Sequence, residues 1–250
     1  MTLRPTPFLA ALGLAALLAS ACGSDDSFPA AAGEAPTTTA EGEGTTDTTA
    51  AGETTETTVE EDVPGGPTAT EAAELRAGLT AALQEHVYLA GQAIGAALET
   101  GPQSPATAAA SATLDDNSVA IGDAVSTGFD PEVGEEFLAL WRDHIGYFVD
   151  YAAATAGGDG AGAETAQEEL DQYRQDTGDL LESASDDVLS ASAVASDLET
   201  HVDGILVTID AIVAGSPEVY PLLQEAATHM SGTAAVLAAA VVEVGEAEGA

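Results

Sequence analysis

The sequence contains no lysine and only four arginines (Arg4, Arg76, Arg142 and Arg174), against 43 aspartates and glutamates. Without lysine the chain has no residue for a Schiff base, for pyridoxal phosphate attachment or for a Walker-type phosphate loop. Its formal net charge of −39 repels phosphate backbones, so we expect no nucleic acid among its partners. The same charge favours loose association with cations.

Cysteine and the common metal motifs are equally scarce. The chain has one cysteine, Cys22, so it has no CxxC motif and cannot form an intramolecular disulfide. No HExxH, HxxxH or Glu-x-x-His pattern is present, which argues against a zinc protease or a ferritin-like di-iron site. No pattern pairs a nucleophile with a base, so we do not expect an enzyme.

The first residues have the pattern of an export signal. Arg4 precedes an apolar run over 8–18, which is too short to span a bilayer and ends in the small residues Ala19-Ser20-Ala21. Cys22 follows directly, and the whole of 1–22 resembles a bacterial lipoprotein signal. The resemblance implies that 1–21 is a signal peptide and that Cys22 carries a lipid. We therefore expect a lipid-anchored protein on the extracytoplasmic face of the cell membrane.

Residues 22–67 are rich in Thr, Glu and Gly and contain almost nothing that could be buried. Such a segment does not recover the conformational entropy lost on ordering, so we expect an acidic, disordered tether. The composition changes at Thr68, where the folded domain is predicted to begin. That domain is predicted to cover 68–245 and to be followed by a short tail, 246–250.

The domain is predicted to be all-α, because no stretch of it alternates as a strand does. Cap signals such as Ser104-Pro105, Asp130-Pro131 and Gly157-Gly158 separate the helices. The predicted helices are 70–99, 105–126, 131–156, 163–183, 189–213 and 217–243. The joints Asp130-Pro131-Glu132-Val133 and Ser216-Pro217-Glu218-Val219 resemble each other. We therefore predict a six-helix bundle of two tandem three-helix repeats, about 69–157 and 160–245.

Aromatic residues are few, and five of the eleven lie between Phe137 and Tyr151. At helical spacing, Phe137, Trp141, His144, Phe148 and Tyr151 fall on one face, with the histidine in the middle of an apolar stripe. Every predicted helix repeats this arrangement with a polar ring or an amide at the corresponding place. In chain order these polar residues are His86, Asn117, His144, Tyr173, His201 and His229.

Two interpretations of the four histidines stay open at this point. In one, they form a hydrogen-bonded polar layer that fixes the register of the helices, since a buried unpaired imidazole is costly. In the other, His86, His144, His201 and His229 hold a copper ion, a zinc ion or a haem. Asp197, Glu225, Asn117 and Tyr173 would then support the ligands from behind, with Asp143 and Glu85 as further carboxylates. A layer of histidines would also titrate near neutral pH.

The strings LWRDHIGYFVDY, LETHVDGILVTIDA and EAATHMSGTAAVLA resemble a group of secreted bacterial helical proteins. The resemblance covers most of 75–243 and implies a duplicated helical unit. Some members of that group are labelled as similar to the N-terminal domain of copper amine oxidases, but the domain behind that label is not recognisable in this chain. From the sequence we therefore expect a binding or interaction module of the cell envelope, whose partner is an unidentified envelope component or a cation. The alternative is a metal- or haem-binding bundle.

Overall fold

The computed structural model describes residues 70–248, which form six α-helices and no strand. The helices are α1 (Glu71–Thr100), α2 (Pro105–Gly128), α3 (Pro131–Gly157), α4 (Gly160–Ala184), α5 (Ala191–Val213) and α6 (Val219–Glu248). The predicted all-α, six-helix architecture is confirmed. The predicted signal peptide, the tether, the lipidated Cys22 and the start of the domain at Thr68 lie outside the described residues.

Side-chain caps set the helix boundaries. Ser104 accepts a hydrogen bond from the backbone N–H of Thr107, so α2 begins at the predicted proline. The α4 helix begins at Gly160 and not at the predicted 163, because Asp159 accepts a hydrogen bond from the Gly162 N–H and caps it there. The α6 helix continues to Glu248, past the predicted end of the domain at 245.

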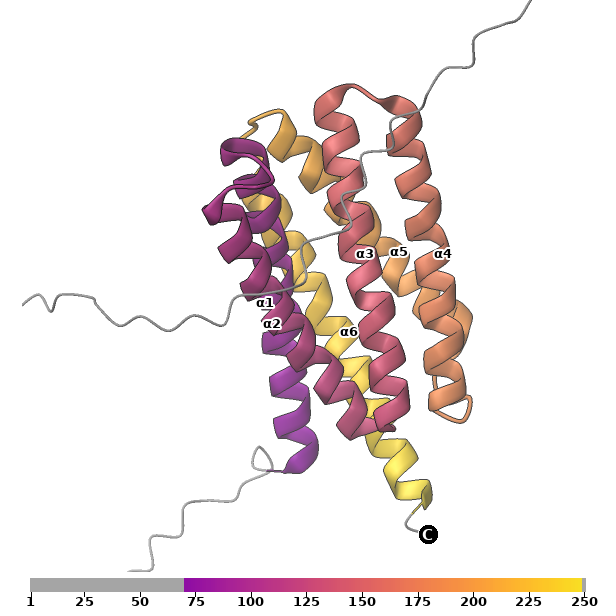
Figure 1. Ribbon diagram of the computed structural model, residues 1–250. Coiled ribbons are helices and arrows are strands. Elements are labelled where there is room, and N and C mark those ends of the chain that lie inside the picture. The colour runs from indigo at the N-terminus through magenta and orange to yellow at the C-terminus, as the bar shows by residue number, and fades with distance from the viewer. Residues whose placement is uncertain (1–69, 249–250) are drawn as a thin grey trace, which may run out of the picture. The chain divides into compact units, whose positions relative to one another are not determined.

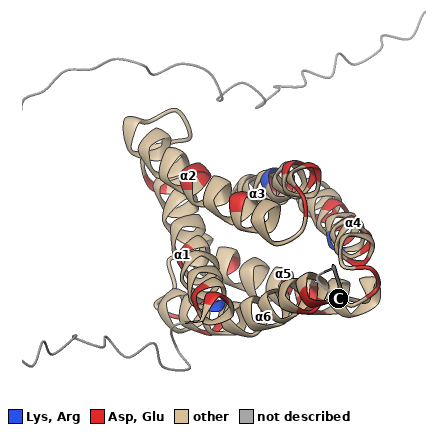
Figure 2. Cartoon of the chain, turned by 90° about the horizontal axis from the view of Figure 1, so that it is seen from below, with Lys and Arg blue, Asp and Glu red and all other residues tan. Residues whose placement is uncertain are grey.

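The six helices lie roughly along one axis and are arranged around it in chain order (Figures 1 and 2). Each helix packs against the next, and α6 packs back against α1. The odd-numbered helices α1, α3 and α5 also contact one another, whereas α4 contacts only its neighbours α3 and α5. The odd-numbered helices therefore line the centre of the bundle.

This alternation has a period of two helices. A duplication of a three-helix unit would place α1 and α4 in equivalent positions, yet α1 contacts α2, α3, α5 and α6, whereas α4 contacts only α3 and α5. The two-unit duplication stays a prediction, and the contacts favour a helical hairpin as the structural unit instead. Each of the three hairpins contributes one histidine from its first helix, namely His86, His144 and His201.

Small and aliphatic side chains fill most of the core. Leu83, Ile121, Leu170 and Ile209 are almost fully buried, and alanines of α6 pack beside them. The segment Val219–Ala247 of α6 is long and apolar enough to cross a membrane, judged by length and composition alone. Its buried face against α1 and α5 explains that composition equally well, because the core helix of a bundle is also apolar.

Candidate functional site

The three inner helices bring three of the four histidines together at the centre of the bundle. His144 of α3 lies between the other two, with its ring centroid 5.6 Å from that of His86 and 6.4 Å from that of His201. The exposed fractions of these residues are 2% for His86, 0% for His144 and 2% for His201. The structure therefore brings together three of the four histidines that the sequence singled out.

Aromatic rings surround the three imidazoles. Trp141 lies 4.7 Å from His86 and 4.6 Å from His144, measured between ring centroids. Tyr173 of α4 stacks on His144 at 4.6 Å with an interplanar angle of 16°. Phe148 lies 5.7 Å from His144 and packs edge-on to it. The imidazoles therefore sit in a buried, aromatic environment.

Nearly all polar atoms of this group lack a hydrogen-bond partner. Within the described residues, the buried side-chain atoms without a partner are His86 Nδ1, Asn117 Oδ1, Trp141 Nε1, both ring nitrogens of His144, Tyr173 OH, Thr177 Oγ1 and both ring nitrogens of His201. Such atoms are rare in folded proteins, and each one calls for an explanation such as a water or an ion. Here every one of them belongs to a single group, which we call the histidine core: His86, Asn117, Trp141, His144, Tyr173, Thr177 and His201.

Burial keeps the three imidazoles uncharged. It lowers the pKa of His86 to about 4, an effect that the neighbouring Asn117 side chain partly offsets. Burial, followed by the proximity of His86 and His229, lowers the pKa of His201 to about 3. The pKa of His144 falls well below its ordinary value, first through burial and then through its two histidine neighbours. Neutral imidazole is the form that binds metal ions.

His229 does not join the histidine core. Its side chain is 24% exposed, and its Nε2 lies 3.1 Å from the carbonyl oxygen of Asp197 and 3.5 Å from Oδ1 of the same residue. Met230, one position further along α6, is fully buried in its place. The predicted apolar stripe of α6 is therefore wrong by about one residue of helical rotation, about 100°.

The predicted supporting residues fall into two groups. Tyr173 and Asn117 belong to the histidine core, and the Asn117 side-chain amide donates to the carbonyl oxygen of Ala82 and to Glu85 Oε2. Asp197 precedes His201 by four positions on α5, a spacing at which the two side chains could touch. It contacts His229 instead and accepts a hydrogen bond from Thr233. Glu225 is exposed.

The geometry matches neither sequence interpretation fully. The ring nitrogens of His144 and His201 make no hydrogen bonds to another side chain, so the histidines do not form the hydrogen-bonded layer that one interpretation expects. Within residues 70–248, no three His, Cys, Asp or Glu side chains are already arranged to hold a metal ion. An ion in the histidine core would therefore require the imidazoles to rotate. That rotation would break no hydrogen bond to another helix at His144 or His201.

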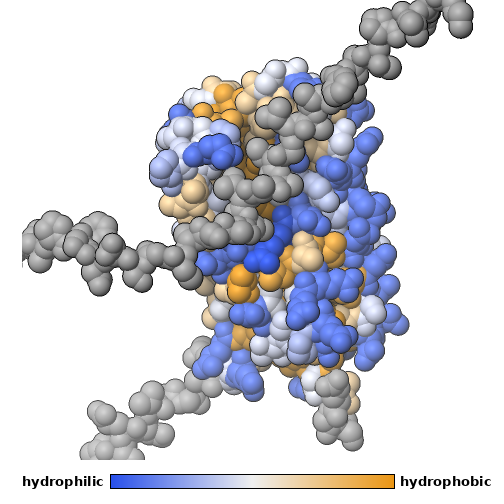
Figure 3. Space-filling model, in the orientation of Figure 1, coloured by the Kyte–Doolittle hydropathy of each residue, from blue (hydrophilic) through white to orange (hydrophobic). Residues whose placement is uncertain are grey.

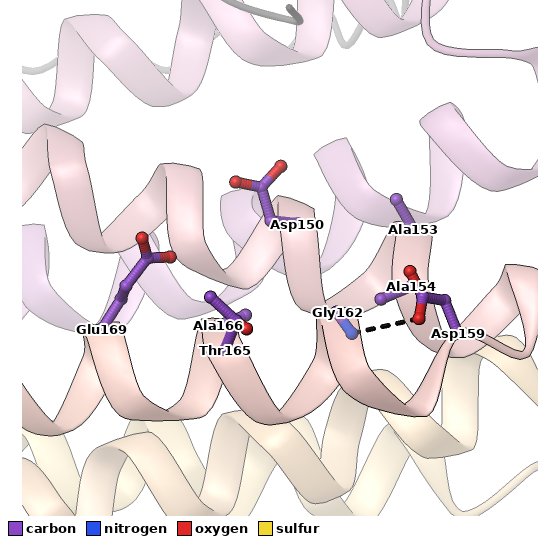
Figure 4. A pocket seen from close by; sticks show the side chains of 8 residues that line it. All are labelled: Asp150, Ala153, Ala154, Asp159, Gly162, Thr165, Ala166 and Glu169. Carbon is purple, nitrogen blue, oxygen red and sulfur yellow. Dashed lines mark hydrogen bonds between the residues drawn. The ribbon is translucent and has the colours of Figure 1, made fainter. Parts of the chain in front are cut away.

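A groove lies between α3 and α4 on the outside of the bundle. No pattern in the sequence predicted a site on this surface. Its upper part has a volume of about 550 Å³ and is lined by small residues of both helices together with Asp150, Asp159 and Glu169. In Figure 4 the side chains of Asp150 and Glu169 extend to the same side of the two helices. The right side of the face in Figure 3, where α4 lies, is strongly hydrophilic.

The lower part of the groove adjoins the upper part at Glu169 and has a volume of about 170 Å³. Its lining residues are Leu140, Asp143, Tyr147, Glu169, Gln172, Tyr173 and Asp176. Burial and the carboxylates of Asp143, Glu169 and Asp176 raise the pKa of Tyr147. Tyr173 thus borders this groove and also stacks on His144. We call the upper and lower parts together the α3–α4 groove.

No protein-family model, no curated protein and no solved structure matches this chain. The resemblance to secreted helical proteins and to lipoproteins therefore stays a prediction. Any function has to be inferred from the residues of this chain.

Proposed function

We propose that the bundle binds one transition-metal ion through the imidazoles of His86, His144 and His201. The observation that carries this proposal is the histidine core, which contains every buried polar side-chain atom without a partner in the described residues. A bound ion would use the lone-pair nitrogen of each imidazole, which removes the energetic cost of leaving that acceptor unpaired.

The surroundings favour copper over zinc or haem. Copper has the highest affinity of the first-row divalent ions for nitrogen ligands. It also exists as a monovalent ion, and the desolvation cost of an ion in an apolar site rises with the square of its charge. A haem would have to displace Trp141, Phe148 and Tyr173, whose rings pack on the imidazoles at 4.6–5.7 Å. A single ion needs only a rotation of side chains.

We further propose that a lipid on Cys22 holds this module on the extracytoplasmic face of the membrane. The support is the sequence alone: an export signal that ends in small residues directly before the only cysteine. The acidic segment 22–67 would act as the tether. Exchange of Cys22 for alanine should release the protein from the membrane fraction. Membrane-bound Cys22→Ala protein would contradict the lipid anchor.

A second candidate function is an interaction module in which the histidine core is purely structural. It is favoured by the absence, among residues 70–248, of three donor side chains already arranged around one point. Element analysis of the full chain after copper loading and dialysis distinguishes the two functions. We expect one copper per chain in the wild type and in His229→Ala, and none in His144→Ala. A metal-free wild type would leave the interaction module as the better account.

A further inference from the structure

The histidine core is closed to solvent, so an ion needs a path to reach it. Its three imidazoles are at most 2% exposed. Tyr173 alone lines the α3–α4 groove and also packs face to face on a histidine of the core. Tyr173 is therefore the residue that links the lower groove to the imidazole of His144.

We propose that the α3–α4 groove is the entry route for the cation and that Tyr173 is its gate. This inference depends on the metal-binding function proposed above, and it names the path and the residues that control access. Tyr173 has an exposed fraction of 3%, and the one group that interacts with its hydroxyl is Thr177, one turn further along α4. No hydrogen bond to another helix therefore holds the ring in place when the side chain rotates.

The charges along the groove suit a cation. The carboxylates that line it are Asp143, Asp150, Asp159, Glu169 and Asp176, and no arginine lines it. The two arginines on its helices pair with other carboxylates: Arg142 with Asp115 of α2, and Arg174 with Asp171 and Glu199. A cleft lined by one sign of charge concentrates oppositely charged ions and raises their association rate.

Two of these carboxylates already accept hydrogen bonds from the protein. Asp159 caps α4, and Asp176 accepts a hydrogen bond from the Gln172 side chain at 2.7 Å. Asp143 and Glu169 lie beside Tyr147 in the lower part of the groove, next to Tyr173. They are therefore the carboxylates that a cation would meet last before the gate.

The route can be tested by the rate of copper entry into the purified full chain. Trp141 is the only tryptophan of the chain and lies against His86 and His144, so a copper ion in the core would quench its fluorescence. Stopped-flow mixing with Cu²⁺, and with Ag⁺ as an air-stable analogue of Cu⁺, gives the loading rate. We expect Asp143→Asn/Glu169→Gln to load at least about threefold more slowly at low salt, with the difference shrinking at high salt.

The matched control is Asp123→Asn/Asp203→Asn, which removes two exposed carboxylates outside the groove and should load at the wild-type rate. Tyr173→Ala should load faster than wild type, because it opens the gate. The groove and control variants should reach the same final copper content as the wild type. Equal rates in the groove and control variants, with normal final binding, would overturn the route but leave the metal site intact. A wild type that is never quenched would overturn the metal site itself.

Discussion

The imidazole of His144 and the phenol of Tyr173 stack nearly parallel at 4.6 Å, and neither side chain forms a hydrogen bond to another helix. This pair joins α3 to α4 and connects the centre of the bundle to the outer groove. A buried pair of polar rings held only by packing is unusual, since buried polar atoms are normally hydrogen-bonded. The first predictions concern this pair.

Tyr173→Phe should keep the stacking on His144 and remove the unpaired hydroxyl. Because an unsatisfied buried hydroxyl costs about 1–3 kcal/mol, the free energy of unfolding should stay the same or rise by up to that amount. Tyr173→Ala should lose about 3–5 kcal/mol by creating a cavity. Urea denaturation monitored by circular dichroism measures both. A loss of more than about 1 kcal/mol in Tyr173→Phe would show that the hydroxyl is bonded after all.

The metal-free protein should lose stability as the pH falls from about 6.5 to about 4. The pKa values of His86 and His201 in the folded state, about 4 and about 3, lie below the unfolded value of 6.5, and that of His144 is also well below it. The unfolded chain therefore takes up protons first, and the stability that the neutral imidazoles retain above pH 6.5 is lost on acidification.

Each of the three histidines adds to this loss, by at most about 1.4 kcal/mol per pH unit where the unfolded form is protonated and the folded form is not. His144→Leu should therefore make the loss of stability on acidification shallower. Urea midpoints measured in steps between pH 7 and pH 4.5 check this. Identical slopes in the variant and the wild type would mean that His144 already carries a proton or is solvated in the folded state.

Gly178 should be among the least replaceable small residues of the bundle. A Cβ atom at this position of α4 would lie 2.5 Å from the backbone oxygen of Ala191, at the start of α5. Gly178→Ala should therefore destabilise the protein by about 1–3 kcal/mol. Gly146 in α3 provides the matched control, since a Cβ there meets nothing within 4 Å. Gly146→Ala should gain about 0.5–1 kcal/mol from helix propensity. Thermal denaturation that ranks the two variants the other way would contradict the close approach of α4 and α5.

The sequence predicted the helices well because their boundaries are local. Ser104-Pro105 and Asp130-Pro131 cap and start α2 and α3 wherever the helices pack, and Gly158 ends α3 with its left-handed φ of 72°. The faces of α1 and α3 were equally predictable, since bulky residues such as Leu83 and Trp141 stand out from their small or polar neighbours.

The face of α6 was not predictable for the opposite reason. The helix is made largely of alanine, valine and other small residues, so several of its faces are apolar and the period does not choose among them. The choice is made by packing against α1 and α5, which buries Met230 and leaves Val236 54% exposed. With this face of α6 turned to the core, His229 lies outside the core. The α3–α4 groove was also beyond the sequence, because it depends on which carboxylates of two helices face each other.

The central claim is that His86, His144 and His201 share one ion and that His229 takes no part. Titration of the full chain with Co²⁺, followed by its visible d–d absorption, tests this most directly in the wild type and the four single His→Ala variants. We predict saturation at one equivalent in the wild type and in His229→Ala, and an affinity at least about 100-fold weaker in each of the other three. Equal spectra in all five proteins, or the loss of binding in His229→Ala alone, would contradict the account.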